Sequence, residues 1–177
     1  MSKTVGMLVE QDYQDMEVWY PLYRLREAGH RVLVIGTGSA PSYKGKFGYP
    51  ITVEATAAEI SAKDLDGLII PGGWAPDYLR RHKAVTDLVR DCHKQGKVVG
   101  AICHAGWVLV SAGILKGKTV TCFSAIKDDV EAAGAAWVDR EVQVDGKLVT
   151  ARKPDDLPAF CREILRLLEK RSAKAKS

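Results

Sequence analysis

Hydrophobic positions along the chain form short, nearly unbroken runs that alternate with stretches of helical spacing. Such runs occupy residues 5–9, 31–35, 65–70 and 98–102. A strand that is apolar at almost every position is buried on both faces, which is typical of a parallel sheet between two layers of helices. These four segments are therefore predicted to be central strands of one sheet.

Helices are predicted between and after these strands, over residues 16–28, 84–94, 105–112, 127–133 and 154–170. The last has the clearest pattern, because its apolar residues recur at helical spacing: Leu157, Phe160, Cys161, Ile164, Leu165 and Leu168. In the first helix we expect Asp15 to be the cap, Pro21 to make the first turn irregular, and Gly29 to end the helix.

Two segments lack helical spacing. Residues 36–50 are rich in Gly, Ser, Lys and Tyr and are predicted to be a loop, with an edge strand before Ile51. Residues 137–152 alternate between apolar and polar positions around Asp145-Gly146, a dipeptide typical of a tight hairpin.

The alternation of strands and helices predicts a doubly wound α/β sandwich with a mainly parallel sheet and helices on both faces. A length of 177 residues suits one domain. We expect this domain over residues 1–170, followed by a basic, flexible tail at 171–177. Ligands bind such sheets at the carboxyl ends of the strands, so we expect the chemistry just after Val9, Ile70 and Ile102.

Composition and charge narrow the function classes. The chain is 46% hydrophobic and 27% charged, which excludes a disordered or fibrous protein. Its net charge of +4 arises largely from the C-terminal tail, so no nucleic-acid partner is expected. No apolar run approaches the roughly 20 residues that span a bilayer, and no signal peptide is recognisable. We therefore expect a cytoplasmic protein with no membrane partner and with four free thiols.

The strongest chemical signal is Cys103-His104, at the end of the run 98–102. Because a helix follows at once, strand, cysteine and helix are predicted to form a nucleophile elbow that holds the sulfur at the strand tip. We expect the helix N-terminus to lower the thiol pKa and favour the thiolate. The backbone N–H of His104 is a candidate oxyanion donor. A cysteine that merely packs in the core is the alternative.

Three further residues are candidates for the same site. Gly73, in Pro71-Gly72-Gly73, is predicted to supply a second oxyanion donor, with an ordinary turn as the alternative. Glu17 is expected to face the elbow, stay protonated and donate a hydrogen bond to sulfur; otherwise it is a capping or solvated acid. Asp77 either orients His104 as the third member of a catalytic set or caps the helix at Tyr78.

A second Cys-His pair, Cys92-His93, serves as an internal control. It lies late in a charged helix with no strand before it, so we predict a surface or half-buried position without catalysis. The four histidines, His30, His82, His93 and His104, show no metal-ligand spacing. No metal is therefore expected. No cofactor is expected either, because the chain has no phosphate-binding P-loop and only half of a dinucleotide-binding motif, Gly36-Thr37-Gly38.

Several motifs together resemble the PfpI family of intracellular proteases. They are distributed over nearly the whole chain: Asp15-Met16-Glu17, Lys44-Gly45-Lys46, Pro71-Gly72-Gly73, Ala75-Pro76-Asp77, Ala101-Ile102-Cys103-His104 and Ile126-Lys127-Asp128-Asp129. This family is part of the DJ-1/PfpI superfamily, which is similar to class I glutamine amidotransferases. The resemblance implies a flavodoxin-like three-layer αβα sandwich.

The resemblance also implies roles for individual residues. Cys103 matches the nucleophile with His104 beside it, and Glu17 matches the acid next to the thiol. An acid at Asp77 would reach the histidine of a neighbouring subunit, so a homo-oligomer, a dimer or a hexamer, is expected. Asp77 is one methylene shorter than the Glu often found at this position, and Phe123 replaces a Tyr of the protease branch. Both departures weaken the hypothesis that the protein is a peptidase.

These observations support three functional hypotheses. The leading one is a cofactor-independent, cysteine-dependent hydrolase or lyase for reactive carbonyl compounds or glycated amino groups, of glyoxalase or deglycase type, in stress protection. The second is an intracellular cysteine peptidase using Cys103, His104 and Asp77. The third is an oxidative-stress sensor or chaperone with an oxidisable Cys103.

Overall fold

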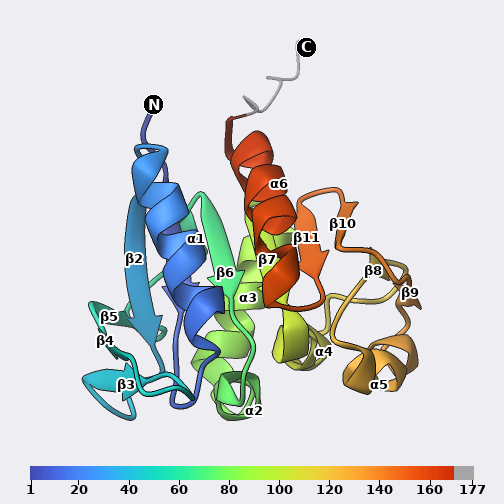
Figure 1. Cartoon of the computed structure of the whole chain (residues 1–177), viewed down its shortest axis with the longest axis horizontal. Helices are drawn as coiled ribbons and strands as arrows, with labels where there is room; N and C mark the ends of the chain where they lie inside the picture. The colour runs from blue at the N-terminus through green and yellow to red at the C-terminus, as the bar shows by residue number, and fades with distance from the viewer. Residues whose placement is uncertain (170–177) are drawn as a thin grey trace.

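The computed structural model of the chain describes residues 1–169 and is a three-layer α/β sandwich (Figure 1). Its central sheet has seven strands in the order β10-β11-β7-β6-β1-β2-β5. All neighbours pair in parallel except β10 and β11. The strand bounds are β1 Thr4–Leu8, β2 Arg31–Gly36, β5 Ala55–Thr56, β6 Gly67–Ile70, β7 Val98–Ile102, β10 Val142–Asp145 and β11 Leu148–Ala151. The predicted fold class is confirmed; the predicted tail at 171–177 lies outside the described residues.

Helices cover both faces of the sheet. In Figure 1, α1 (Asp15–Glu27) and α6 (Leu157–Glu169) lie side by side in front of the sheet, and α3 (Lys83–Lys94) lies behind it. Three shorter helices gather at the edge where the parallel strands end: α2 Ala75–Leu79, α4 Gly106–Ala112 and α5 Lys127–Ala132. Single 3₁₀ turns occupy Ala62–Asp64, Cys103–Ala105, Ser124–Ile126 and Pro154–Asp156.

The predicted apolar runs form the core. Every residue of β6 and β7 is buried, and each fully buried aliphatic side chain contributes about 1.5–3 kcal/mol relative to exposure. Close packing of α6 explains the small residue at the centre of β7. A Cβ on Gly100 would lie 2.8 Å from Cδ1 of Ile164 and 2.9 Å from Cζ of Phe160.

The start of α1 differs from the prediction. Gln14, not Asp15, caps the helix, because its side chain accepts a hydrogen bond from the backbone N–H of Met16. The Asp15 carboxylate instead accepts hydrogen bonds from the N–H groups of Phe47 at 3.0 Å and Tyr49 at 3.1 Å. Asp15 therefore fastens a distant loop to α1, which helical pattern alone does not reveal.

The rest of α1 is regular. The helix runs without interruption through Pro21, so the predicted irregular first turn is wrong. Gly29 follows the helix with a φ of 82°, as expected for a residue that ends a helix in the left-handed region.

The loop predicted at 36–50 contains more structure than expected. Strand β3 (Ser42–Lys44) pairs antiparallel with β4 (Pro50–Thr52) in a small separate sheet. Strands β8 (Thr119–Val120) and β9 (Ala136–Trp137) form a second small sheet, which the sequence pattern also missed. The predicted hairpin at Asp145-Gly146 joins β10 and β11 and is confirmed.

Cys92 is fully buried on the sheet-facing side of α3, so its predicted surface or half-buried position is wrong. The charged residues around it occupy the other side of this amphipathic helix.

No helix within residues 1–169 is long and apolar enough to cross a membrane.

Candidate active site

Cys103 stands at the sharp turn between β7 and α4. Its φ is 62°, in the left-handed region that residues with a Cβ rarely adopt. Backbone strain of this kind costs about 1–3 kcal/mol and is concentrated at functional sites. The predicted nucleophile elbow is therefore observed, with the sulfur at the tip of the sheet.

Glu17 faces this sulfur from α1. Its side chain is fully buried, and its Oε2 accepts a hydrogen bond of 2.6 Å from the backbone N–H of Gly72. Burial raises the pKa of Glu17 to about 7, although the Gly72 N–H and the Cys103 side chain act against this rise. Glu17 can therefore take up or release a proton near neutral pH.

Gly72 is required by the close approach of these two groups. A Cβ at this position would lie 2.6 Å from the Cβ of Cys103 and 2.6 Å from Oε2 of Glu17. The next residue, Gly73, has a φ of 77° and directs its backbone N–H at the sulfur, as does His104. The two predicted backbone donors thus converge on Cys103.

The protonation of Cys103 differs from the prediction. Burial, followed by the charge of Glu17, raises the pKa of the thiol to about 12, despite the N–H groups of His104 and Gly73. The expected lowering of the thiol pKa is wrong, because desolvation outweighs the N-terminus of the short helix α4. Removal of this proton near neutral pH would need a neighbouring base, and the Glu17 carboxyl contacts the thiol.

His104 lies beside the thiol in an aromatic environment. Its Nδ1 is 3.2 Å from Sγ of Cys103. The ring stacks on Phe123 with centroids 4.9 Å apart and meets Trp107 edge-on at 5.2 Å. Burial, assisted by the charge of Lys46, lowers the pKa of His104, so the imidazole is neutral at pH 7.

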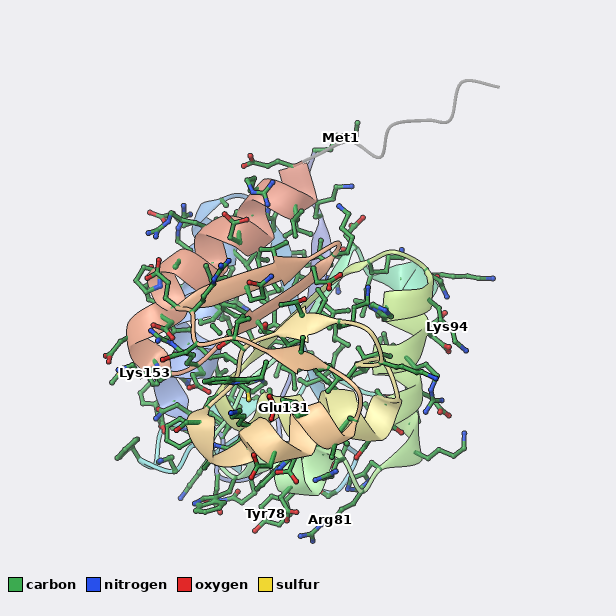
Figure 2. The ribbon with its side chains drawn as sticks, turned by 90° about the vertical axis from the view of Figure 1, so that its right-hand side faces the viewer. Met1, Tyr78, Arg81, Lys94, Glu131 and Lys153 are labelled. Atoms are coloured by element: carbon green, nitrogen blue, oxygen red, sulfur yellow. The ribbon has the colours of Figure 1, made fainter. Side chains whose placement is uncertain are left out.

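Asp77 does not join this group within the described chain. It lies in the first turn of α2, and its carboxylate pairs with Arg81. Figure 2 shows Arg81 and Tyr78 together at the lower edge of the molecule, apart from Lys153. Trp74 is the N-cap residue of α2, so the alternative prediction that Asp77 caps this helix is also wrong. Contact between Asp77 and the histidine of another subunit stays a prediction.

The site opens into a cavity of about 170 Å³. Glu17, Gly73, Cys103 and His104 line this cavity together, as the sequence predicted. A space of this size admits a small molecule or the end of a side chain, but not a folded segment of polypeptide.

Other cavity-lining residues were missed by sequence reasoning. Lys46, Trp74 and Lys153 border the same space from three separate loops. Lys46 belongs to the quoted motif Lys44-Gly45-Lys46, but nothing in its local pattern connects it with Cys103. Only the folded arrangement brings the two together.

Several known proteins are similar to this chain over nearly its whole length. Protein/nucleic acid deglycase 2 of Escherichia coli is 42% identical over 95% of this chain and 99% of its own length. Deglycase PfpI of Pyrococcus furiosus is 40% identical over 92% of this chain and 97% of its own length. General stress protein 18 of Bacillus subtilis is 40% identical over 96% of this chain and its entire length.

A solved structure supports the same relationship. A two-domain protein of Anabaena variabilis, with DJ-1/ThiJ/PfpI-like and ferritin-like domains, superimposes with a TM-score of 0.93 and 38% identity. The match covers 99% of this chain and 52% of that protein, so this chain spans about half of it. The model of the DJ-1/PfpI family matches residues 3–167, and the chain belongs to that family.

Proposed function

We propose that this chain is a cofactor-independent cysteine enzyme that acts on reactive carbonyl compounds and on their early adducts with amino groups. The observation that carries the proposal is the buried carboxyl of Glu17 beside the elbow thiol of Cys103, in a cavity of about 170 Å³. A small cavity favours small electrophiles over polypeptides. The deglycase names of two relatives support the same chemistry.

The first step is addition of the thiol to a carbonyl. The sulfur of Cys103 bonds to the aldehyde carbon of a 2-oxoaldehyde while its proton passes to the Glu17 carboxylate. The electron pair of the C=O bond moves to oxygen, which the N–H groups of Gly73 and His104 stabilise. Glu17 then returns the proton to this oxygen, and a hemithioacetal results.

The remaining steps convert the hemithioacetal into a 2-hydroxy acid. Neutral His104 accepts the proton of the former aldehyde carbon and delivers it to the ketone oxygen, which gives an enediol. The Glu17 carboxylate then accepts the hydroxyl proton on the sulfur-bearing carbon and delivers it to the adjacent carbon, which yields a 2-hydroxy thioester. Water hydrolyses this thioester and restores the thiol of Cys103. In the reaction of an amine adduct, the C–N bond breaks as the C–S bond forms, and the amine leaves with the proton that Glu17 took from the thiol.

The direct test is turnover of methylglyoxal and of a methylglyoxal-treated amino acid by the wild type and by Cys103→Ala. We expect the wild type to form lactate and release the free amine, with only background rates for the variant. Equal rates for the two proteins would contradict the proposal.

A cysteine peptidase is the second candidate, favoured by the 3.2 Å contact between Nδ1 of His104 and Sγ of Cys103. Because Asp77 pairs with Arg81, no acid among residues 1–169 is hydrogen-bonded to this histidine. Fluorogenic peptides decide between the two functions. Cleavage that is lost in Cys103→Ala would establish the peptidase, whereas methylglyoxal turnover without cleavage would exclude it.

We also propose that the chain works as a homo-oligomer, a dimer or a hexamer. A hollow of about 1090 Å³ lies between α1 and the start of α6, and exposed Met16, Tyr20 and Tyr23 line it. Pro154 borders both this hollow and the cavity above Cys103, so a second copy seated here would lie close to the site.

Sedimentation of the full chain tests this assembly. The wild type should sediment as a dimer or larger particle, and a Tyr20→Glu, Tyr23→Glu double variant should sediment as a monomer. A monomeric wild type at micromolar concentration would contradict the assembly.

A further inference from the structure

Lys46 is held at the rim of the site cavity by a loop that is fastened to α1. Its backbone N–H donates to the carbonyl of Tyr13 at 2.9 Å. Immediately after it, the N–H groups of Phe47 and Tyr49 bind the Asp15 carboxylate. Hydrogen bonds to Tyr13 and Asp15 thus fix the backbone from which the Lys46 side chain reaches the cavity.

Gly45 shows how tightly this loop packs. A Cβ at Gly45 would overlap the carboxylate of Asp15, so only glycine allows the loop to approach α1 this closely. The Gly45 N–H donates to the carbonyl of Tyr49 at 2.9 Å, which closes the loop on itself. The backbone at Lys46 is therefore fixed by packing and hydrogen bonds.

The charge of Lys46 has no partner among the described residues. No carboxylate oxygen of residues 1–169 lies within 4.0 Å of its ammonium, which lies over the ring of Phe47, 5.3 Å from the ring centroid. Lys153, the other cation that lines the cavity, pairs with Asp155 at 3.1 Å. The single acid in the lining is Glu17, which already accepts from Gly72.

The positive charge of Lys46 influences the three groups of the site that could exchange protons. Its charge lowers the pKa values of Glu17, Cys103 and His104, although burial is the largest influence on each. Lys46 lines the same cavity as Cys103, so an anion bound there would share that space with a cation that no carboxylate of the described residues pairs.

We propose that Lys46 is the specificity-determining residue that binds the carboxylate of a 2-hydroxy acid product, and of carbonyl compounds that carry a carboxylate next to the reacting carbon. The inference rests on the proposed function, because that reaction creates a carboxylate on the carbon that was bound to Cys103. A charge-assisted hydrogen bond to an otherwise unpaired ammonium favours such an anion over a neutral molecule of the same shape.

Binding of lactate and lactamide to Cys103→Ala, measured by ligand-observed NMR titration, tests the inference without any chemistry. The two molecules have nearly the same shape and differ in charge. We expect lactate to bind at least about tenfold more tightly than lactamide, in line with the usual strength of charged hydrogen bonds. Lys46→Gln in the same background should remove the preference, and Lys46→Arg should keep most of it.

Lys44→Gln is the matched control, because Lys44 lies two residues away in β3 and does not line the cavity. It should bind both molecules like its parent. Equal affinities for lactate and lactamide in Cys103→Ala, or an unchanged preference in Lys46→Gln, would overturn the inference.

Methylglyoxal turnover by the wild type separates this inference from the proposed function. Turnover without a lactate preference would remove only the role of Lys46. A lactate preference that depends on Lys46, without turnover, would keep the anion site and remove the proposed reaction.

Discussion

The chain carries the dipeptide Cys-His twice, and the two copies have different surroundings. Burial raises the pKa of both thiols, Cys92 and Cys103, to about 12. Cys92 lies inside a regular helix, where consecutive side chains do not face each other. Cys103 lies at a strained elbow with Nδ1 of His104 at 3.2 Å.

The two cysteines differ in the groups that lie beside the thiol, not in the pKa of the thiol itself. Glu17, with its pKa raised to about 7, faces Cys103, whereas Cys92 is enclosed in the apolar layer between α3 and the sheet. An acidic thiol is therefore not what distinguishes the elbow. We therefore expect a base within reach and a cavity beside the sulfur to make Cys103 more reactive than Cys92.

Alkylation rates should show the largest contrast between the two regions. We expect iodoacetamide at pH 8 to label Cys103 at least about 1,000-fold faster than Cys92, because a fully buried thiol reacts only after the protein opens. Mass spectrometry of peptides after timed quenching measures both rates in one sample. Similar rates in the native protein would contradict the comparison, and rates in guanidinium chloride provide the unfolded reference.

Glu17→Gln should reduce the difference in alkylation rate between Cys103 and Cys92. Labelling of Cys103 should fall by about 100-fold, because general base assistance contributes about 10²–10⁴-fold. In the wild type the rate should rise as the pH passes through about 7, the pKa of Glu17. The variant should lack this rise, while Cys92 serves as the internal control. A wild-type rate that rises only near the pKa of a free thiol would exclude Glu17 as the base.

The same carboxyl should make stability depend on pH. The pKa of Glu17 is about 7 in the folded state and 4.5 ordinarily, so between these values the folded state binds more protons than the unfolded state. Stability should therefore fall as the pH rises through this window, by about 3 kcal/mol in total for this group. Urea unfolding at pH 4.5 and pH 8 measures the difference.

Glu17→Gln should remove this part of the pH dependence. Cys92→Ala, the control in the other region, should unfold with the pH dependence of the wild type. Identical pH dependence in Glu17→Gln and the wild type would show that the folded carboxyl titrates normally.

The smallest difference between the two regions is expected in the stability lost when a glycine with positive φ is replaced by alanine. Gly73, beside the elbow, has a φ of 77°, and a Cβ there would lie 2.5 Å from the carbonyl oxygen of Asp12. Gly96, after α3, has a φ of 68° and open space around it. We expect Gly73→Ala to lose at least about 2 kcal/mol of stability and Gly96→Ala about 1 kcal/mol. Equal losses in urea unfolding would show that packing around Gly73 is not restrictive.

Much of the fold could be predicted, because apolar runs and helical spacing are local signals. The buried strands, the amphipathic α6 and the elbow at Cys103 follow from residues that are neighbours in sequence. The convergence of Glu17 and Gly73 on the sulfur also followed, since parallel strands end at the same edge of the sheet. The small sheets β3–β4 and β8–β9 could not be predicted, because strands of two or three residues carry too little pattern.

Residues with polar partners far away in sequence were predicted least well. Asp15 looks like a helix cap but binds the backbone of the loop at 47–49. Asp77 looks like an orienting acid but pairs with Arg81 one turn along. A carboxylate has several acceptable partners, and local sequence does not decide which of them is nearest in the folded chain.

Neighbouring residues specify the sheet, its helices and the elbow that holds Cys103, because backbone geometry and hydrophobic spacing are local properties. The protonation of the site and the presence of Lys46 in its lining depend instead on segments that meet only when the chain is folded. Removal of water around a charge depends on atoms from every segment that packs against it. For Cys103 these atoms come from α1, from the turn after β6 and from the loop before α5, and no single segment contains that information.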